Sequence, residues 1–183
     1  GDADGYVVVE RAPGETLHER FTDLGDDGQR HVVETLGRYL AELHDTFAFD
    51  AYGEVVVVDG TDAFRAAGST DWPAWFTEYA RTGVAALPPA FSDLRRLLTE
   101  AIERCPLPDR PPSRLFPWDF RPGNTLVADG RVTAVLDWEA LLAAAPGLSV
   151  AKAEHLVADW YVSDGTPLRA AFRAGYATER PYP

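Results

Sequence analysis

The chain has 183 residues, 46% of them hydrophobic, and a formal net charge of −12 at pH 7. This length and apolar content suffice for one domain with a sizeable core. The acidic residues are spread along the chain, which argues against a nucleic acid or an anionic membrane as the partner. No apolar run approaches the length that a membrane span requires.

Two explanations of the acidity stay open. Only one of the 17 basic residues, Lys152, is a lysine, and abundant acid with arginine, alanine and valine is typical of a halophilic source. A positively charged small-molecule partner is the alternative. The single cysteine, Cys105, excludes an internal disulfide and indicates a reducing, cytoplasmic compartment. We expect Cys105 to be a small apolar filler near a helix end.

Apolar periodicity and turn signals predict the elements in chain order. These are a strand at 6–10, a helical turn at 15–20, a helix at 29–46, a strand at 55–58, helices at 72–87 and 91–104, strands at 125–128 and 131–136, and helices at 149–161 and 167–178. Asp71 or Ser69 is expected to cap the second helix, and Ser149 the fourth. The aromatic face that begins at Trp72 is expected to be core, and His44 to cap or pack. The pattern predicts an α+β fold that is mainly α.

One stretch near the middle of the chain has the spacing of a phosphoryl-transfer loop. Asp119 and Asn124 form an Asp-x-x-x-x-Asn motif, and Asp137 follows thirteen residues later. Asp129-Gly130 signals a two-residue hairpin turn. In a tight hairpin Asn124 would face Val135, so Asn124 and Asp137 would share its open end. The alternative is that these residues are ordinary turn formers.

Residues 115–139 resemble the catalytic segment of the aminoglycoside phosphotransferase and choline kinase-like superfamily, which reads His-Gly-Asp, four residues, Asn, a hairpin, then Asp-Trp/Phe-Glu. Residues 6–17 resemble the hinge strand of that family, and residues 36–44 its first large-lobe helix. The resemblance covers nearly the whole chain. It implies a protein-kinase-like C-terminal lobe with a catalytic-loop β-hairpin.

The resemblance also implies roles for individual residues. Asp119 would orient or deprotonate a hydroxyl of an unknown small molecule, which receives the γ-phosphoryl group. Asn124 and Asp137 would bind Mg²⁺. Arg121 would meet phosphate or acceptor, or else form a salt bridge within its loop.

Further residues have supporting or nucleotide-binding roles by the same resemblance. Backbone groups of Glu10, Arg11 and Ala12 would contact the base of ATP or GTP. Trp138 and Glu139 are expected to pack and to support the site.

Two departures from the family pattern leave alternatives to a kinase open. Pro117-Trp118 replaces the His-Gly before Asp119, and Trp118 is expected to project into the acceptor site. Ala145 and Ser149 replace two supporting Asp residues. The alternatives to a kinase are therefore a non-catalytic kinase-like binding module, and an unrelated acidic helical domain with a chance motif.

The domain organisation follows from the same comparison. The family holds phosphate with a lysine from its N-terminal lobe, whereas Lys152 follows the proposed metal ligands. We expect residues 1–14 to be a hinge-like strand and turn and residues 15–183 to be the large lobe. An N-terminal lobe is not expected within this chain, which by itself should be inactive.

Overall fold

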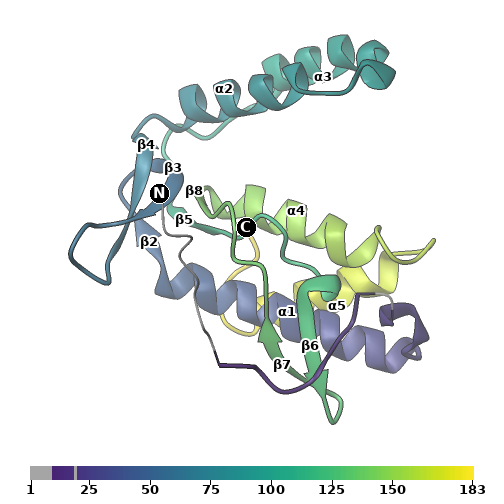
Figure 1. The fold of residues 1–183 in the computed structure, drawn as a ribbon. Coiled ribbons are helices and arrows are strands. Elements are labelled where there is room, and N and C mark those ends of the chain that lie inside the picture. Colours follow the sequence, from purple (N-terminus) through teal and green to yellow (C-terminus); the bar gives the residue numbers. More distant parts are fainter. Residues whose placement is uncertain (1–9, 19) are drawn as a thin grey trace, which may run out of the picture.

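The computed structural model describes residues 10–18 and 20–183, and within them the fold is mixed helix and sheet (Figure 1). The helices are α1 (Asp26–Thr46), α2 (Trp72–Ala85), α3 (Ser92–Arg104), α4 (Pro146–Ala158) and α5 (Thr166–Ala177), with short 3-10 turns η1 (Phe21–Asp23), η2 (Pro89–Phe91) and η3 (Pro122–Asn124). Most of the predicted strand at 6–10 lies outside the described residues. None of the helices in the described ranges has both the length and the apolar character to cross a membrane.

Helices α1, α4 and α5 enclose the main core, which also receives Leu17, Phe21 and Phe120. Helix α1 begins three residues before the predicted start, because Asp26 and Asp27 belong to its first turn, where acidic side chains complement the helix dipole. Helix α4 likewise begins at Pro146 rather than at residue 149.

Two glycines bring α1 and α5 into close contact. A Cβ atom built on Gly37 would lie 2.1 Å from the carbonyl oxygen of Phe172, and one on Gly175 would lie 1.9 Å from that of Glu34. No larger residue fits at either position without separating the helices. The α1–α5 contact therefore depends on glycine, which has no side chain, at positions 37 and 175.

A small antiparallel sheet carries the predicted hairpin. Its strands, in spatial order, are β1 (Glu15–Thr16), β6 (Thr125–Ala128) and β7 (Arg131–Val135). The helical turn predicted at 15–20 is therefore wrong, because residues 15 and 16 pair with β6, which is remote in sequence. Asp129 and Gly130 form the turn with φ angles of 50° and 72°, as a two-residue hairpin requires.

The hairpin register differs from the prediction by one residue. A bulge between Leu126 and Val127 places Thr125, rather than Asn124, opposite Val135. Thr133 lies at this irregularity, and its hydroxyl donates a 2.5 Å hydrogen bond to the carbonyl oxygen of Pro13. The contact ties the segment after Ala12 to the hairpin.

A second antiparallel sheet lies at the other end of α1. Its order is β2 (Ala48–Phe49), β5 (Ser113–Phe116), β8 (Leu142–Ala144), β3 (Tyr52–Val57) and β4 (Phe64–Ser69). Only β3 was predicted, over a shorter span, because the other four strands lack a local signal of alternating or β-branched residues. Strand β8 follows the hairpin directly and pairs with both β5 and β3.

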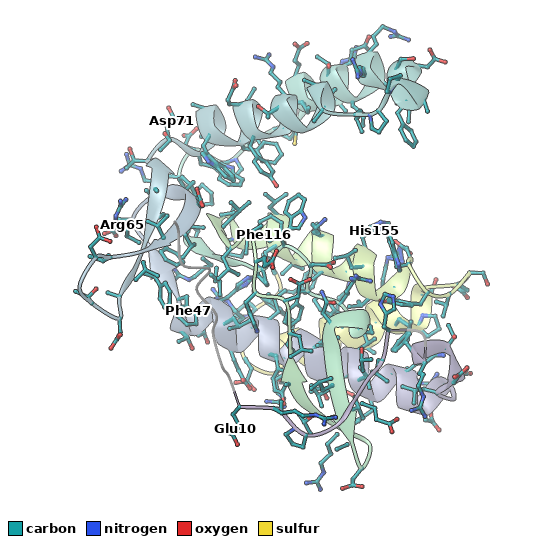
Figure 2. The ribbon with its side chains drawn as sticks, viewed as in Figure 1. Glu10, Phe47, Arg65, Asp71, Phe116 and His155 are labelled. Atoms are coloured by element: carbon teal, nitrogen blue, oxygen red, sulfur yellow. The ribbon has the colours of Figure 1, made fainter. Side chains whose placement is uncertain are left out.

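Helices α2 and α3 form an arm that projects from the body, and Asp71 lies where the arm begins (Figures 1 and 2). The Asp71 carboxylate accepts a hydrogen bond from the Ala74 amide at 3.0 Å, which confirms the predicted cap. Trp72 is buried against Tyr52, so the aromatic face does begin in core. Cys105 lies at the end of α3, as predicted, but it is exposed, so the prediction that it is an apolar filler is wrong.

Candidate active site

The loop between β5 and β6 directs the Asp119 carboxylate toward two neighbours. Arg121 Nε donates to Asp119 Oδ1 at 2.8 Å, so Arg121 forms the salt bridge within the loop that was one of its two expected roles. Asn124 Nδ2 donates to Asp119 Oδ2 at 3.0 Å and to the Asp119 carbonyl oxygen at 3.0 Å. The Asp119 side chain is 32% exposed, so its oxygens remain accessible.

Asp137 reaches the same point from the other strand of the hairpin. Its Oδ2 atom lies 3.4 Å from Asn124 Nδ2, and the amide of the preceding Leu136 donates to the Asn124 carbonyl oxygen at 2.7 Å. Asp137 has a φ of 63°, in the left-handed region, which turns the chain immediately after β7. The structure thus brings Asp119, Asn124 and Asp137 together at the open end of the hairpin.

Tyr161, just beyond α4, braces this loop from the opposite side. Its hydroxyl accepts a hydrogen bond from the Gly123 amide at 3.0 Å and lies 3.4 Å from Arg121 Nη1. A Cβ atom on Gly123 would lie 2.7 Å from that hydroxyl, so a larger residue would displace the Tyr161 side chain. The burial of Arg121 lowers its pKa, but the hydrogen bonds to Asp119 and Tyr161 outweigh burial and raise the pKa overall.

A cavity of about 370 Å³ opens beside the three polar residues. It is lined by Trp118, Asp119, Arg121, Asp137, Glu139, Ala140, Leu156 and Trp160. Sequence reasoning anticipated Trp118 and the acidic residues, but it missed Leu156, Trp160 and the nearby Lys152. These three belong to α4 and the turn after it, and no motif in that segment indicates a site.

The side chains are suited to a magnesium ion in their ligand chemistry. Mg²⁺ prefers oxygen ligands and is usually held by one or two carboxylates together with substrate phosphates and water. Asn124 and Asp137 would supply an amide oxygen and a carboxylate, which requires the Asn124 amide to turn, because its Nδ2 atom and not its oxygen faces Asp137 here. Within the described ranges, no group of three or more His, Cys, Asp or Glu could hold a metal ion. A metal at this place would therefore need phosphate oxygens to complete its shell.

The predicted base-binding segment lies apart from the cavity. Glu10 and Arg11 are exposed, Ala12 is half-buried, and none of the three lines the cavity. Figure 2 shows Glu10 at the edge of the body, on the side of the hairpin. The structure therefore does not bring these residues to Asp119.

The residues near Asp137 that were expected to pack do so in part. Trp138 donates from Nε1 to the Val135 carbonyl oxygen at 2.7 Å and contacts the Phe120 ring, although its side chain is 42% exposed. Glu139 lines the cavity. Ser149, in place of a family Asp, lies inside α4 and contacts His44 Nε2 at 3.1 Å, so it is not the cap that was predicted.

His44 packs in the core rather than capping a carbonyl. Its Nδ1 atom lies 2.7 Å from the Tyr176 hydroxyl, and the ring is fully buried. Burial, assisted by the charge of Arg180, lowers the pKa of His44 from 6.5 to about 3. This residue joins α1, α4 and α5 and does not belong to the cavity.

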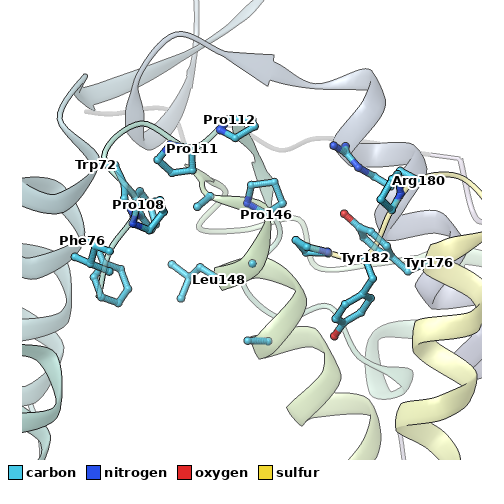
Figure 3. A pocket seen from close by; sticks show the side chains of 16 residues that line it. Trp72, Phe76, Pro108, Pro111, Pro112, Pro146, Leu148, Tyr176, Arg180 and Tyr182 are labelled. Atoms are coloured by element: carbon cyan, nitrogen blue, oxygen red, sulfur yellow. The ribbon is translucent and has the colours of Figure 1, made fainter. Parts of the chain in front are cut away.

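A larger cavity, of about 660 Å³, lies elsewhere, between the base of α2, the proline-rich connector and the C-terminal tail (Figure 3). Trp72 and Phe76 form one wall, and Tyr176 and Tyr182 the other. Among the residues that the structure describes, no carboxylate side chain lines it. Phosphoryl transfer, which requires a metal ion and a proton acceptor, is better suited to the smaller cavity.

The fold thus joins a loop–hairpin site, on the small sheet, to the helical layer behind it. The sequence matches the phosphotransferase enzyme family over residues 1–183, and the chain belongs to that family. No curated protein sequence matches the chain.

Solved structures share the fold. Aminoglycoside phosphotransferase APH(4)-Ia is 18% identical with a TM-score of 0.57, over 92% of this chain and 55% of that enzyme. Macrolide 2'-phosphotransferase MphH from Brachybacterium faecium is 20% identical with a TM-score of 0.57, over 94% and 55%. A thermostable APH(4)-Ia mutant in complex with AMP-PNP and hygromycin B is 17% identical with a TM-score of 0.53, over 90% and 59%. The chain thus spans less than two thirds of each enzyme.

Proposed function

We propose that the protein moves the γ-phosphoryl group of ATP or GTP to a hydroxyl group of a small molecule. One observation carries the proposal: the Asn124 amide contacts the carboxylates of both Asp119 and Asp137. Three oxygen-bearing side chains that meet beside a cavity provide a proton acceptor and a pair of metal ligands. The solved relatives whose names specify aminoglycoside and macrolide phosphotransferases support the same reaction class.

In the proposed reaction a bond forms between the acceptor oxygen and the γ-phosphorus, while the bond from that phosphorus to the β–γ bridging oxygen breaks. Asp119 orients the acceptor hydroxyl and takes up its proton on the carboxylate. Asn124 and Asp137 would hold Mg²⁺, and the bound ion would neutralise phosphate charge. Arg121 holds Asp119 in place through its 2.8 Å hydrogen bond.

The nucleotide base is assigned to the segment before the hairpin. Backbone groups of Glu10, Arg11 and Ala12 would contact the base, with residues 1–14 as a hinge and residues 15–183 as the large lobe. The hydrogen bond from Thr133 to Pro13 supports this assignment, because it keeps the segment beside the hairpin. The lone cysteine supports a cytoplasmic location.

A matched pair of variants tests the proposal in the full-length protein that contains these residues. Asp119→Asn should lower turnover by about 10²–10⁴-fold, as expected for a general base, with nearly unchanged magnesium–nucleotide affinity. Asp129→Asn makes the same chemical change at the hairpin turn and should leave turnover unchanged. Equal turnover in the two variants would refute the role of Asp119.

The second candidate is a non-catalytic kinase-like module that binds a nucleotide without transferring phosphate. Two observations favour it. Arg121 and Asn124 already donate hydrogen bonds to the two carboxylate oxygens of Asp119, and Pro117-Trp118 stands in place of His-Gly. Magnesium-dependent nucleotide hydrolysis or transfer by the full-length protein would exclude this candidate. Nucleotide binding without any turnover would favour it.

A further inference from the structure

Lys152 is the only lysine of the sequence, and the fold places it against Trp118. Its Nζ atom lies 3.9 Å from the centre of the Trp118 ring, which is a cation–π contact. Trp118 precedes Asp119 and lines the candidate cavity, with 41% of its surface exposed. The ammonium group is therefore held next to the loop that carries the proposed proton acceptor.

The helix that carries Lys152 also forms a wall of the cavity. Leu156 is four residues further along α4, and side chains at this spacing lie on one helix face. Leu156 and Trp160 both line the cavity, so Lys152 lies one turn away from it on the same face. The loop and α4 thus come together at the Lys152–Trp118 contact and across the cavity at Leu156.

The surroundings of Lys152 leave its charge available to a ligand. Burial lowers the pKa of Lys152, and the charge of Asp119 raises it in part, so the ammonium senses that carboxylate. In the part of the chain that the structure describes, Lys152 forms the Trp118 contact but no hydrogen bond or ion pair. An ammonium group has three donors, and Arg121, the other cation of the site, already contacts Asp119 and Tyr161.

We propose that Lys152 binds an anionic oxygen of the phosphoryl group under transfer, with Trp118 as the platform that orients its ammonium. The inference rests on the proposed function. Three carboxylates, Asp119, Asp137 and Glu139, line the cavity, so a polyphosphate needs added positive charge there. Lys152 supplies this charge from α4. The alternative source of the anionic oxygen is a charged group on the acceptor.

Spectroscopy of residues 1–183 tests the binding step directly. Because the chain has one lysine, protein labelled with ¹³C at lysine Cε gives one resonance, which the Trp118 ring should shift upfield. Trp118→Leu should remove this shift. Magnesium tripolyphosphate should move the resonance in the unmodified protein, whereas sodium sulfate at equal ionic strength should not. If glycerol 3-phosphate moves it and tripolyphosphate does not, the acceptor supplies the anion. A resonance that responds to neither phosphate compound overturns the proposal.

Kinetics of the full-length protein separate this proposal from the proposed function. Lys152→Met should lower kcat/KM by about 10- to 100-fold, the value of one charge-assisted hydrogen bond, and Lys152→Arg should restore part of it. Arg131→Met removes the same charge at the far end of the hairpin and should have no effect. Unchanged thermal melting of Lys152→Met would show that the loss is not caused by unfolding.

The two ideas can fail separately. If Asp119→Asn loses turnover while Lys152→Met keeps it, the proposed function stands and the role of Lys152 is refuted. If neither variant affects turnover, the roles of both Asp119 and Lys152 are refuted. The proposed function itself is refuted if the unmodified full-length protein transfers no phosphoryl group. If Lys152→Arg is as inactive as Lys152→Met, the ammonium does not act as a general phosphate-binding cation.

Discussion

Asn124 links the two halves of the candidate site through a single amide group. It contacts Asp119, on its own loop, and Asp137, at the end of the following strand. Asp137 reaches this position because its backbone is left-handed, with a φ of 63°. An aspartate tolerates that conformation better than a branched or bulky residue, so the required ligand chemistry and the required backbone shape coincide.

The metal role of Asp137 predicts a specific loss. Asp137→Asn should weaken nucleotide binding at least about tenfold in the presence of Mg²⁺, because a charged oxygen ligand is lost. Binding of the nucleotide with magnesium chelated should change little. Calorimetric titration of the full-length protein measures both affinities, with Asp129→Asn as the control for a lost carboxylate. Equal magnesium dependence in Asp137→Asn and the unmodified protein would contradict the assignment.

His44 predicts how stability depends on pH. Its pKa is lowered from 6.5 to about 3 in the folded protein, so the unfolded chain binds the proton first as the pH falls. As the pH is lowered from 6.5 to about 3, protonation of His44 should therefore decrease the free energy of unfolding by about 1.4 kcal/mol per pH unit. Above pH 6.5 this contribution is fully present.

Chemical denaturation at several pH values measures this effect. His44→Gln cannot acquire the proton, so part of the acid dependence should disappear in that variant, even if it is less stable at neutral pH. His31→Gln, at an exposed position of the same helix, should keep the full dependence. Identical pH slopes in His44→Gln and the unmodified protein would contradict the buried neutral histidine.

At the scale of elements, the contact between α1 and α5 determines the arrangement of the helical layer. Gly37→Ala should destabilise the protein by about 1–3 kcal/mol or more, because the added methyl group would meet the backbone of Phe172. Gly83→Ala is the matched control, since a Cβ atom on this glycine of α2 has nothing within 4 Å. The control should be neutral or gain up to about 1 kcal/mol from helix propensity. Thermal melting distinguishes the two, and equal melting temperatures would refute the close approach.

The arm of α2 and α3 depends less on burial than the helical layer does. Helix α3 has no buried residue, and Leu94, Leu97 and Leu98 are each at least 40% exposed. The arm joins the body through Trp72, which packs on Tyr52. A second link runs from Trp75 through the stacked Tyr79 ring to Trp118. The aromatic face of α2 therefore connects the arm to the candidate cavity.

At the scale of the whole molecule, the net charge of −12 implies repulsion within the folded state. We expect the melting temperature to rise from low salt to concentrated KCl, because salt reduces the screening length from about 10 Å at 0.1 M to about 3 Å at 1 M. A gain of about 1 kcal/mol would raise it by about 2–4 °C. This outcome would support a halophilic source.

Sucrose at the same osmolality controls for effects other than charge screening, because it acts by exclusion from the surface. The exposed ion pairs, such as Arg96–Glu100 on α3, oppose the trend, since salt weakens them. Each contributes little, so repulsion should dominate. A constant or falling melting temperature would instead favour attraction of a cationic acceptor as the reason for the acidity.

Local sequence signals are sufficient to predict several helices and turns and to indicate the family. The spacing of apolar residues predicts α1, the Asp71 cap predicts the start of α2, and Asp129-Gly130 predicts the hairpin turn, because each depends on residues close together in the chain. The motif from Asp119 to Asp137 likewise resembles its family within one short segment, and the family match confirms that resemblance.

Only the tertiary structure decided the features that join distant segments. Strand β1 exists because it pairs with β6, and β8 because it lies between β5 and β3. The bulge near Val127 changed the register that an ideal hairpin would have. Lys152 of α4 and Tyr161, just beyond the end of α4, contact the Asp119 loop from more than thirty residues away in sequence, where no motif identifies them. Such contacts follow from packing in three dimensions, which local propensity does not encode.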